Sequence, residues 1–326
     1  MAQTVSWDWL LTGFRIDLET QVKPKTIKGY CEHVSYFIRW ARENSKDGPC
    51  SVTKRDIQEF LHFIASNPAI FSLGHGVVRR VQRDENSRWH HYYSLKRFFT
   101  WAFSEKYIKQ NPIDGIILRP PKAAPIEPYK PEHIEAFLKI LDHEWQVATT
   151  TRQKMLAARN RAVLMLFLDS FIRLEECSQL KLGDIDLDNQ RLLVRKSKTG
   201  KPRLAGFSPQ TKKYLWRYLS FRGNEFEHDA LWVTEEGRPL GKHGVQEIVR
   251  RLKEDAGLQH LKGSVHKLRH TGATVTLKHT RDMKGLKLLL GHSTLAMTER
   301  YTQFVDAEDA LKAYDEQGPV DWLLSK

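Results

Sequence analysis

Residues 119–131, RPPKAAPIEPYKP, hold five of the thirteen prolines in this 326-residue chain and show no apolar periodicity. Proline fixes φ and biases the residue before it away from helix, so we expect an extended, semi-rigid linker here. The chain is long enough for two domains of ordinary size. The linker therefore predicts an N-terminal domain at residues 1–118 and a C-terminal domain at residues 132–326.

The N-terminal part shows helical spacing of apolar residues in segments 26–43, 53–66 and 89–107. Thr53 precedes Asp56 by three residues, which indicates an N-cap with a capping box. We expect a small all-helical bundle whose helices begin near residue 26, with no further domain before it. Aromatic residues of the last segment follow its amphipathic pattern and are expected in the core rather than as base-stacking platforms: Tyr93, Phe98, Phe99, Trp101 and Phe103.

The C-terminal part is expected to be mainly helical with a small antiparallel sheet. Residues 159–171 are apolar nearly all round, which is typical of a buried helix. Residues 184–208 alternate like strands around a turn at Thr199 and Gly200, which predicts a hairpin. Ser208 followed by Pro209 predicts a capped helix start. Further helices are expected at 131–142, 241–255, 264–279, 283–292, 295–302 and 306–316.

The net charge of +13 and the pI near 9.5 indicate a polyanionic partner. Lys and Arg outnumber Asp and Glu by 18 to 12 in residues 1–121 and by 34 to 27 in residues 122–326. A basic excess on both domains suits DNA held from two sides, because each neutralised phosphate releases counterions. Candidate backbone contacts in the first domain are Lys54, Arg55, Lys96 and Arg97. A basic surface without such a partner is the alternative.

Several classes of protein lack support in the sequence. No apolar run approaches the roughly 18 residues of a membrane span, and the N-terminus does not read as a secretory signal, so we expect a soluble protein inside the cell. The three cysteines are far apart and form no disulfide or zinc-ribbon pattern. Motifs for nucleotide hydrolysis, dinucleotide binding and α/β-hydrolase chemistry do not occur.

The sequence HKLRHT offers a site for a phosphate. His266 and Arg269 are three residues apart on a predicted helix and are neighbours on its surface. Arg173 follows the buried helix, and two guanidinium groups can neutralise a phosphodiester without a metal ion. His266 and His270 are a poor zinc site, because no third ligand is placed by spacing.

A tyrosine, Tyr301, lies nine residues beyond His292 and can act as a nucleophile if the fold brings it to the arginines. A phenol has a pKa near 10 and needs a base, which His266 or His270 can supply. Lys198 in the hairpin is suited to protonate the leaving oxygen of DNA. Each residue also has an ordinary structural interpretation as a packed tyrosine, a surface arginine or a solvated lysine.

The ordered segments FIRLEECSQLKLGDID, KSKTGKPR, HKLRHTGAT and LLLGHSTLAMTERYTQF together resemble the tyrosine recombinase (phage integrase) family, and in particular its two-domain Xer-like members. The resemblance implies a scissile-phosphate clamp, a general acid, a general base or phosphate donor, a further phosphate hydrogen-bonding residue, a buttressing carboxylate and a nucleophile: Arg173 with Arg269, Lys198, His266, His292, Glu176 and Tyr301. Lys196 and Lys201 flank Lys198 and are the alternatives for the acid. The chain has Ser170, Phe171 and Ile172 where the family usually has Thr-Gly-Leu, and Glu175 where it usually has Ser.

The same resemblance implies that the first domain is a core-binding, SAM-like DNA-binding domain. It further implies a tetramer on two double-stranded DNA sites, cleavage through a 3′-phosphotyrosyl link and a Holliday junction, and no metal or other cofactor. The C-terminal tail after Tyr301 is expected to pack on a neighbouring protomer, and packing on its own domain is the alternative. A cytoplasmic, nucleoid-associated enzyme, of a chromosome or a mobile element, fits this pattern. The alternatives are a non-catalytic sequence-specific DNA-binding protein and a type IB topoisomerase-like enzyme.

Overall fold

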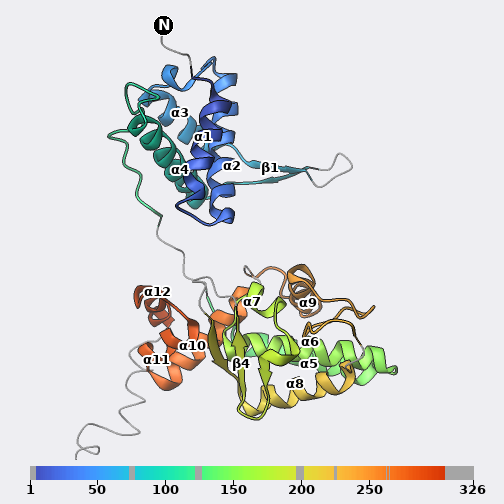
Figure 1. Cartoon of the computed structure of the whole chain (residues 1–326). Helices are drawn as coiled ribbons and strands as arrows, with labels where there is room; N and C mark the ends of the chain where they lie inside the picture. The colour runs from blue at the N-terminus through green and yellow to red at the C-terminus, as the bar shows by residue number, and fades with distance from the viewer. Residues whose placement is uncertain are drawn as a thin grey trace, which may run out of the picture. The chain divides into compact units, whose positions relative to one another are not determined.

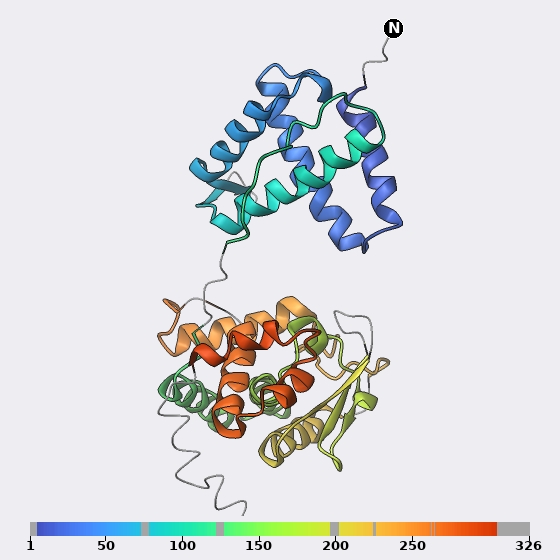
Figure 2. The same cartoon turned by 90° about the vertical axis from the view of Figure 1, so that its left-hand side faces the viewer.

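The computed structural model of the chain describes residues 5–72, 78–121, 127–195, 202–223, 226–261, 263 and 265–304. The chain divides into two compact units, residues 1–123 and 124–326. Unit 1 is helical with one two-stranded hairpin, and unit 2 is helical with a three-stranded sheet (Figures 1 and 2). A mainly α fold with a small antiparallel sheet in the C-terminal unit is therefore confirmed.

Unit 1 contains four α-helices, one 3₁₀ turn and two strands among its described residues: α1 Trp7–Glu19, α2 Pro24–Glu43, η1 Pro49–Ser51, α3 Lys54–Ser66, β1 Ala69–Ser72, β2 Val78–Val81 and α4 Glu85–Ser104. The three predicted helices are α2, α3 and α4. The capping box at the start of α3 is confirmed, because the Thr53 side chain accepts from the Asp56 N–H and the Asp56 carboxylate accepts from the Thr53 N–H at 2.7 Å.

The prediction that the helices begin near residue 26 is wrong. Helix α1 begins at Trp7 and is capped by Ser6, whose hydroxyl accepts from the Trp9 N–H. Its buried residues, Trp7, Leu10, Phe14 and Leu18, recur at helical spacing and join the core of unit 1. The apolar stripe of this helix was thus present in the sequence.

The prediction of an all-helical first domain is also wrong. Strands β1 and β2 pair antiparallel, from Ala69 opposite Val81 to Ser72 opposite Val78. The ribbon extends away from the helices of unit 1 (Figure 1). Each strand has only four residues, which is too short for a clear alternating pattern in the sequence.

Aromatic residues of α4 divide between core and surface. Phe98 and Phe99 are fully buried, as predicted, and Trp101 packs against the core. Tyr93 and Phe103 are 43% and 47% exposed, so the prediction is wrong for these two. The buried stripe of α4 runs through Tyr92, Leu95, Phe98, Phe99 and Ala102, and positions 93 and 103 lie beside it.

Unit 2 contains these described elements: α5 Pro131–Val147, α6 Thr151–Ser170, α7 Leu174–Ser178, η2 Leu182–Asp184, β3 Ile185–Asp186, β4 Arg191–Val194, β5 Arg203–Gly206, α8 Pro209–Arg222, α9 Lys242–Asp255, α10 Val265–Thr280, α11 Met283–Leu290, α12 Ala296–Glu299 and η3 Thr302–Phe304. The strands form an antiparallel sheet in the order β3-β4-β5. Ser208 caps α8 and Pro209 is its first residue, as predicted. The predicted turn at Thr199 and Gly200 and the predicted helix at 306–316 lie outside the described residues.

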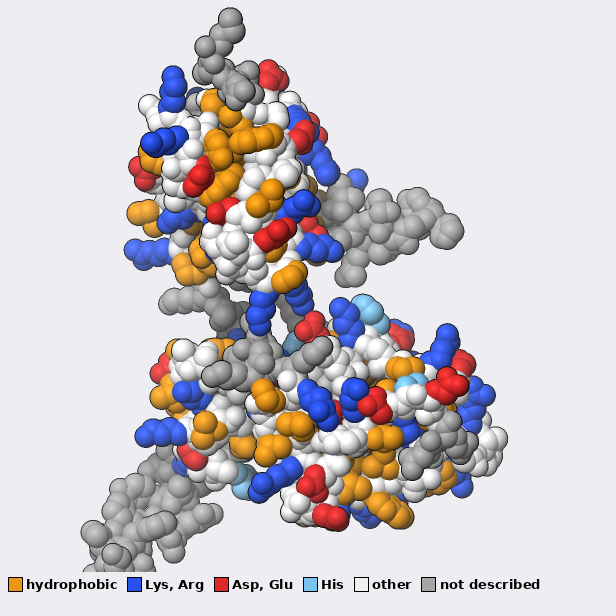
Figure 3. All heavy atoms as spheres, viewed as in Figure 1, with side chains coloured by type: hydrophobic (Ala, Val, Ile, Leu, Met, Phe, Trp, Pro, Cys, Tyr) orange, Lys and Arg blue, Asp and Glu red, His pale blue; other side chains and the backbone are white. Residues whose placement is uncertain are grey.

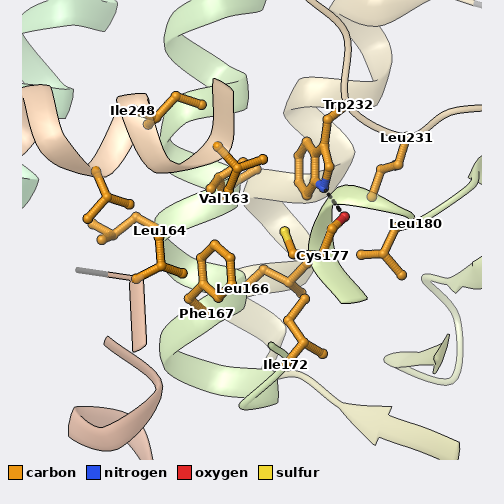
Figure 4. Close-up of a cluster of buried hydrophobic side chains, with 14 of the residues drawn as sticks. Val163, Leu164, Leu166, Phe167, Ile172, Cys177, Leu180, Leu231, Trp232 and Ile248 are labelled. Carbon is orange, nitrogen blue, oxygen red and sulfur yellow. Dashed lines mark hydrogen bonds between the residues drawn. The ribbon is translucent and has the colours of Figure 1, made fainter. Parts of the chain in front are cut away.

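Helix α6 is the centre of unit 2. The Thr150 hydroxyl and the Gln153 side chain form a capping box at its start, and most of its residues are buried. It packs against α5, α8 and α10. Val163, Leu166 and Phe167 of α6 join a cluster in which the Trp232 indole N–H donates to the Cys177 carbonyl oxygen at 3.1 Å (Figure 4). This core fixes the C-terminal end of α6. Arg173, the first predicted site residue along the chain, follows the last residue of α6, Ser170, by three positions.

Basic side chains lie on both units, interspersed with acidic and hydrophobic ones (Figure 3). Among the described residues, no helix has both the length and the apolar character to cross a membrane.

Candidate active site

Arg269 is a buried guanidinium that links the ends of two other helices. It lies on α10 and is 4% exposed. The guanidinium donates to the carbonyl oxygen of Phe171, the C-cap of α6, and to that of Leu290, the last residue of α11, at 2.8 Å. Free carbonyl groups at helix C-termini attract a cation. Burial, followed by the charge of Arg173, lowers the pKa of Arg269 to about 10.

Phe171 creates the turn that leads from α6 to the site. Its φ of 52° and ψ of 29° place it in the left-handed region, which a non-glycine residue enters at a cost of about 1–2 kcal/mol. The side chain is 5% exposed and packs with Leu286, Leu290 and Tyr301. Burial of the ring offsets the backbone strain at this position.

Arg173 is the N-cap of α7 and is held by Glu176. One carboxylate oxygen of Glu176, Oε2, accepts the Arg173 backbone N–H at 2.8 Å, and the other, Oε1, accepts Arg173 Nη1 at 2.9 Å. The Glu176 side chain is only 3% exposed. Burial alone raises a carboxyl pKa, but the charge of Arg203 and the bonds from Arg173 hold the pKa of Glu176 below its ordinary value. Glu176 is therefore an ionised buttress for Arg173.

Tyr301 lies between α12 and η3 and is 2% exposed. It packs against α10 and α11 residues, including Ala273 and Leu286. Burial raises the pKa of its phenol, while the charges of Arg269 and Arg300 act in the opposite direction. Tyr301 and Arg269, 32 residues apart in sequence, are thus direct neighbours.

Three histidines surround this tyrosine and the arginines. The ring centroids of His270 and Tyr301 are 5.2 Å apart, and those of His292 and Tyr301 are 6.5 Å apart with nearly parallel planes. His292 Nδ1 lies 3.0 Å from the Thr298 hydroxyl, which orients its ring. Burial lowers the pKa of both His270 and His292 to about 4, assisted by nearby arginines. Both imidazoles are neutral at pH 7.

His266 stands at the exposed rim of the site. Partial loss of solvent around its ring lowers the pKa of His266, and the charges of Arg269 and Arg173 add to the effect. It is therefore also a neutral imidazole at pH 7 beside both guanidinium groups.

Arg203 is a site residue that the sequence analysis missed. Its Nη2 donates to Glu176 Oε2 at 2.7 Å and its Nη1 donates to the Leu289 carbonyl oxygen at 3.1 Å. The available signal was its place at the end of KSKTGKPR. Lys198 and its alternatives Lys196 and Lys201 lie outside the described residues.

The four basic candidates of unit 1 lie on α3 and α4. Lys54, Arg55 and Lys96 are exposed, and Arg55 pairs with Glu59 at 2.8 Å. Arg97 donates to the Gln21 side chain at 2.7 Å and lies 5.3 Å from the centroid of the Tyr30 ring. Within the described residues, no group of three His, Cys, Asp or Glu side chains is placed to hold a metal ion.

Comparison with known proteins places this arrangement in one family. Residues 131–308 match the Phage integrase family. Tyrosine recombinase XerC of Lactobacillus delbrueckii subsp. bulgaricus is 28% identical over 290 residues, which cover 87% of this chain and 90% of that protein. Tyrosine recombinase XerC 2 of Ralstonia nicotianae is 28% identical over 330 residues, which cover 98% of this chain and 88% of that protein.

Solved structures share the fold. The XerH site-specific recombinase bound to a palindromic difH substrate matches with a TM-score of 0.68 and 19% identity, over 96% of this chain and 90% of that one. The Tn1549 transposon integrase in complex with a circular intermediate DNA matches with a TM-score of 0.68 and 17% identity, over 94% and 99%. The chain therefore belongs to the phage integrase family and is a tyrosine-type, site-specific DNA recombinase.

Proposed function

We propose that Tyr301 is the nucleophile of this recombinase and that Arg173 and Arg269 bind the scissile phosphate of double-stranded DNA. The observation that carries the proposal is the shared pocket: Tyr301 packs in one cluster with Phe171, whose carbonyl oxygen accepts from Arg269, and the charges of Arg269 and Arg173 both act on the phenol. Two guanidinium groups beside one phenol suit a phosphodiester whose negative charge grows in the transition state.

In the proposed step the Tyr301 oxygen forms a bond to phosphorus and the bond from phosphorus to the 5′ oxygen of the next nucleotide breaks. The product is a 3′-phosphotyrosyl ester and a free 5′ hydroxyl group. The phenolic proton passes to a neutral imidazole, for which His266, His270 and His292 are candidates. Lys198, which lies outside the described residues, is proposed to protonate the leaving oxygen on the strength of the sequence pattern alone.

Reversal of the step by a 5′ hydroxyl from another strand rejoins DNA, since the ester keeps the energy of the broken bond. Exchange of strands in two such rounds passes through a Holliday junction. We propose a tetramer on two DNA sites, with unit 1 as the core-binding domain that contacts the backbone through Lys54, Arg55, Lys96 and Arg97. The tail at residues 305–326, also outside the described residues, is proposed to pack on a neighbouring protomer. A cytoplasmic, nucleoid-associated location and a role on a chromosome or a mobile element accompany this proposal.

A trapping experiment tests the nucleophile. Duplexes selected for binding from a randomised pool are nicked at successive positions, so that the short cleaved fragment diffuses away and the covalent protein–DNA adduct accumulates. We expect an adduct at Tyr301 with the wild-type chain and none with Tyr301→Phe. Tyr129→Phe is a matched control, because the buried Tyr129 hydroxyl has no hydrogen-bond partner within the described residues. An adduct formed by Tyr301→Phe at the wild-type rate refutes the assignment.

A further inference from the structure

Arg203 joins parts of the site that are far apart in sequence. It opens β5, and its side chain is 13% exposed. One end of its guanidinium binds Glu176, 27 residues earlier, and the other binds the carbonyl oxygen of Leu289, 86 residues later. The Leu290 carbonyl, next along the chain, accepts from Arg269. Arg203 thus links Glu176, which binds Arg173, to the C-terminal end of α11, which binds Arg269.

Glu176 shares its single negative charge between two arginines. Oε2 accepts from Arg203 Nη2 and from the Arg173 backbone, while Oε1 accepts from Arg173 Nη1. Because Oε2 accepts from both Arg203 Nη2 and the Arg173 backbone N–H, the carboxylate has little freedom to rotate. Oε1 is therefore held in the position from which it binds Arg173 Nη1. Bidentate and fork-like contacts of this kind fix geometry as well as adding energy.

Gly291 makes room for this bridge. Its φ is +64°, and a Cβ atom there would lie 2.9 Å from Arg203 Cδ and 3.0 Å from Arg203 Nε. Glycine is therefore needed both for the left-handed backbone and for the close approach of Arg203. The next residue is His292, so the Arg203 side chain packs directly against the turn that leads to this histidine.

Stability alone does not explain a buried arginine at this position. Arg203 Nε is buried, and among the described residues it has no hydrogen-bond partner. A buried unpaired donor is costly, and an apolar side chain would avoid that cost. The pairing of Arg203 with both halves of the site points to a role in the reaction.

We propose that Arg203 is a positioning residue. By binding Glu176 and the Leu289 carbonyl oxygen, it fixes the position of Arg173 relative to the end of α11 and His292. This inference rests on the proposed function of Tyr301, Arg173 and Arg269. Arg203 acts through the other groups and does not itself bind DNA in this proposal.

The test compares Arg203→Met and Arg203→Lys with Arg222→Met. Arg222 is a matched control, because it is a buried arginine of the same unit whose guanidinium also bridges carbonyl groups, those of Leu231 and Ala230, away from the site. We expect Arg203→Met to lower the single-turnover rate of adduct formation at saturating DNA about 100-fold, with DNA affinity within about twofold of wild type. Arg203→Lys is expected to lose about tenfold, since one ammonium cannot span both partners. Arg222→Met is expected to melt at a lower temperature but to keep its rate within about twofold when folded.

A double variant tests the route through Glu176. If Arg203 acts through that carboxylate, then Arg203→Met adds little to the loss caused by Glu176→Gln. Full multiplication of the two losses overturns the inference, as does a wild-type rate for Arg203→Met or a loss confined to DNA affinity.

A titration without DNA separates this inference from the proposed function. The Glu176 carboxyl group, followed by NMR in the full chain, is expected to titrate at higher pH in Arg203→Met than in wild type, because its strongest opposing charge is gone. An unchanged titration overturns the inference even if the wild-type chain cleaves DNA. Absence of a wild-type adduct together with the shifted titration refutes the proposed function and keeps the link between Arg203 and Glu176.

Discussion

Replacement of Gly272 by alanine tests whether close contact between α10 and α6 positions the site. A Cβ atom on Gly272 would overlap the Leu168 carbonyl oxygen, and it would lie 2.8 Å from the carbonyl carbon and 3.0 Å from Phe171 Cε1. Carbon atoms in contact normally lie about 3.5–4.0 Å apart, so the two helices must separate locally by about 1 Å. The obstacle is backbone, which cannot rotate away as a side chain can. We therefore take the upper part of the usual cost of overpacking, about 3 kcal/mol.

For a unit of this size each kcal/mol lowers the melting temperature by about 2–4 °C, so Gly272→Ala is expected to lower that of unit 2 by about 6–12 °C. Calorimetry of the full chain measures the change. Gly29→Ala is the control, since Gly29 is inside α2 with nothing within 4 Å of its added Cβ. It is expected to stabilise unit 1 by up to about 1 kcal/mol through helix propensity.

The same substitution is expected to impair the reaction. Arg269 lies three residues before Gly272 on α10 and binds the carbonyl oxygen of Phe171, the residue whose ring the new Cβ would displace. Below the melting temperature we expect adduct formation to fall more than about tenfold. A Gly272→Ala protein that melts within 2 °C of wild type, or cleaves at the wild-type rate, refutes this account of the helix contact; the 2 °C limit is about the effect of 1 kcal/mol.

Two further predictions concern pH and salt. Burial lowers the pKa of His91 in unit 1 to about 3, with the charges of His33 and Arg83 contributing. The unfolded chain therefore binds a proton on this imidazole near pH 6.5, whereas the folded chain binds it only near pH 3. The unfolding free energy is expected to be unaffected by this group above pH 6.5 and to fall by up to about 1.4 kcal/mol per pH unit as the pH drops toward 3. Urea unfolding of the full chain at pH 7 and pH 4.5 measures this loss of stability. An equally steep loss in His91→Leu contradicts the prediction. DNA affinity is expected to fall steeply between 50 and 200 mM salt, about 10³-fold or more if six or more phosphates are neutralised, and a flat response in a filter-binding titration counts against a basic clamp.

The elements that sequence predicted well are those whose signals are local. The capping box at Thr53 and the Ser208–Pro209 start depend on atoms within four residues of each other, and both appear in the structure. The buried character of the second half of α6 follows from its apolar residues, which lie on nearly all sides of the helix. The β1–β2 ribbon depends on pairing between two short strands, which no local pattern specifies.

For the site, sequence motifs indicated candidate residues but not their partners. The order of Arg173, Arg269 and Tyr301 along the chain resembled a family, and the structure brings these three together. The sequence analysis did not identify Arg203, because an isolated arginine in a strand carries no functional signal. Its place in the site becomes apparent only from its contacts with Glu176 and Leu289. The left-handed conformation of Phe171 was equally hidden, since it depends on the burial of its ring among Leu286, Leu290 and Tyr301.

The electrostatics of the site divide the proposed chemistry between two kinds of side chain. Among the described residues, Glu176 is a buried carboxylate that pairs with Arg173 and Arg203, and Arg269 binds carbonyl oxygens, so a DNA phosphate can add negative charge beside these three guanidinium groups. Guanidinium groups stay protonated at neutral pH and cannot accept a proton. Burial raises the pKa of Tyr301, so its phenol is also protonated at that pH, and the attack requires a separate acceptor. The neutral imidazoles of the site are candidates for that task, because burial, assisted by the same positive charges that attract phosphate, keeps them unprotonated at pH 7.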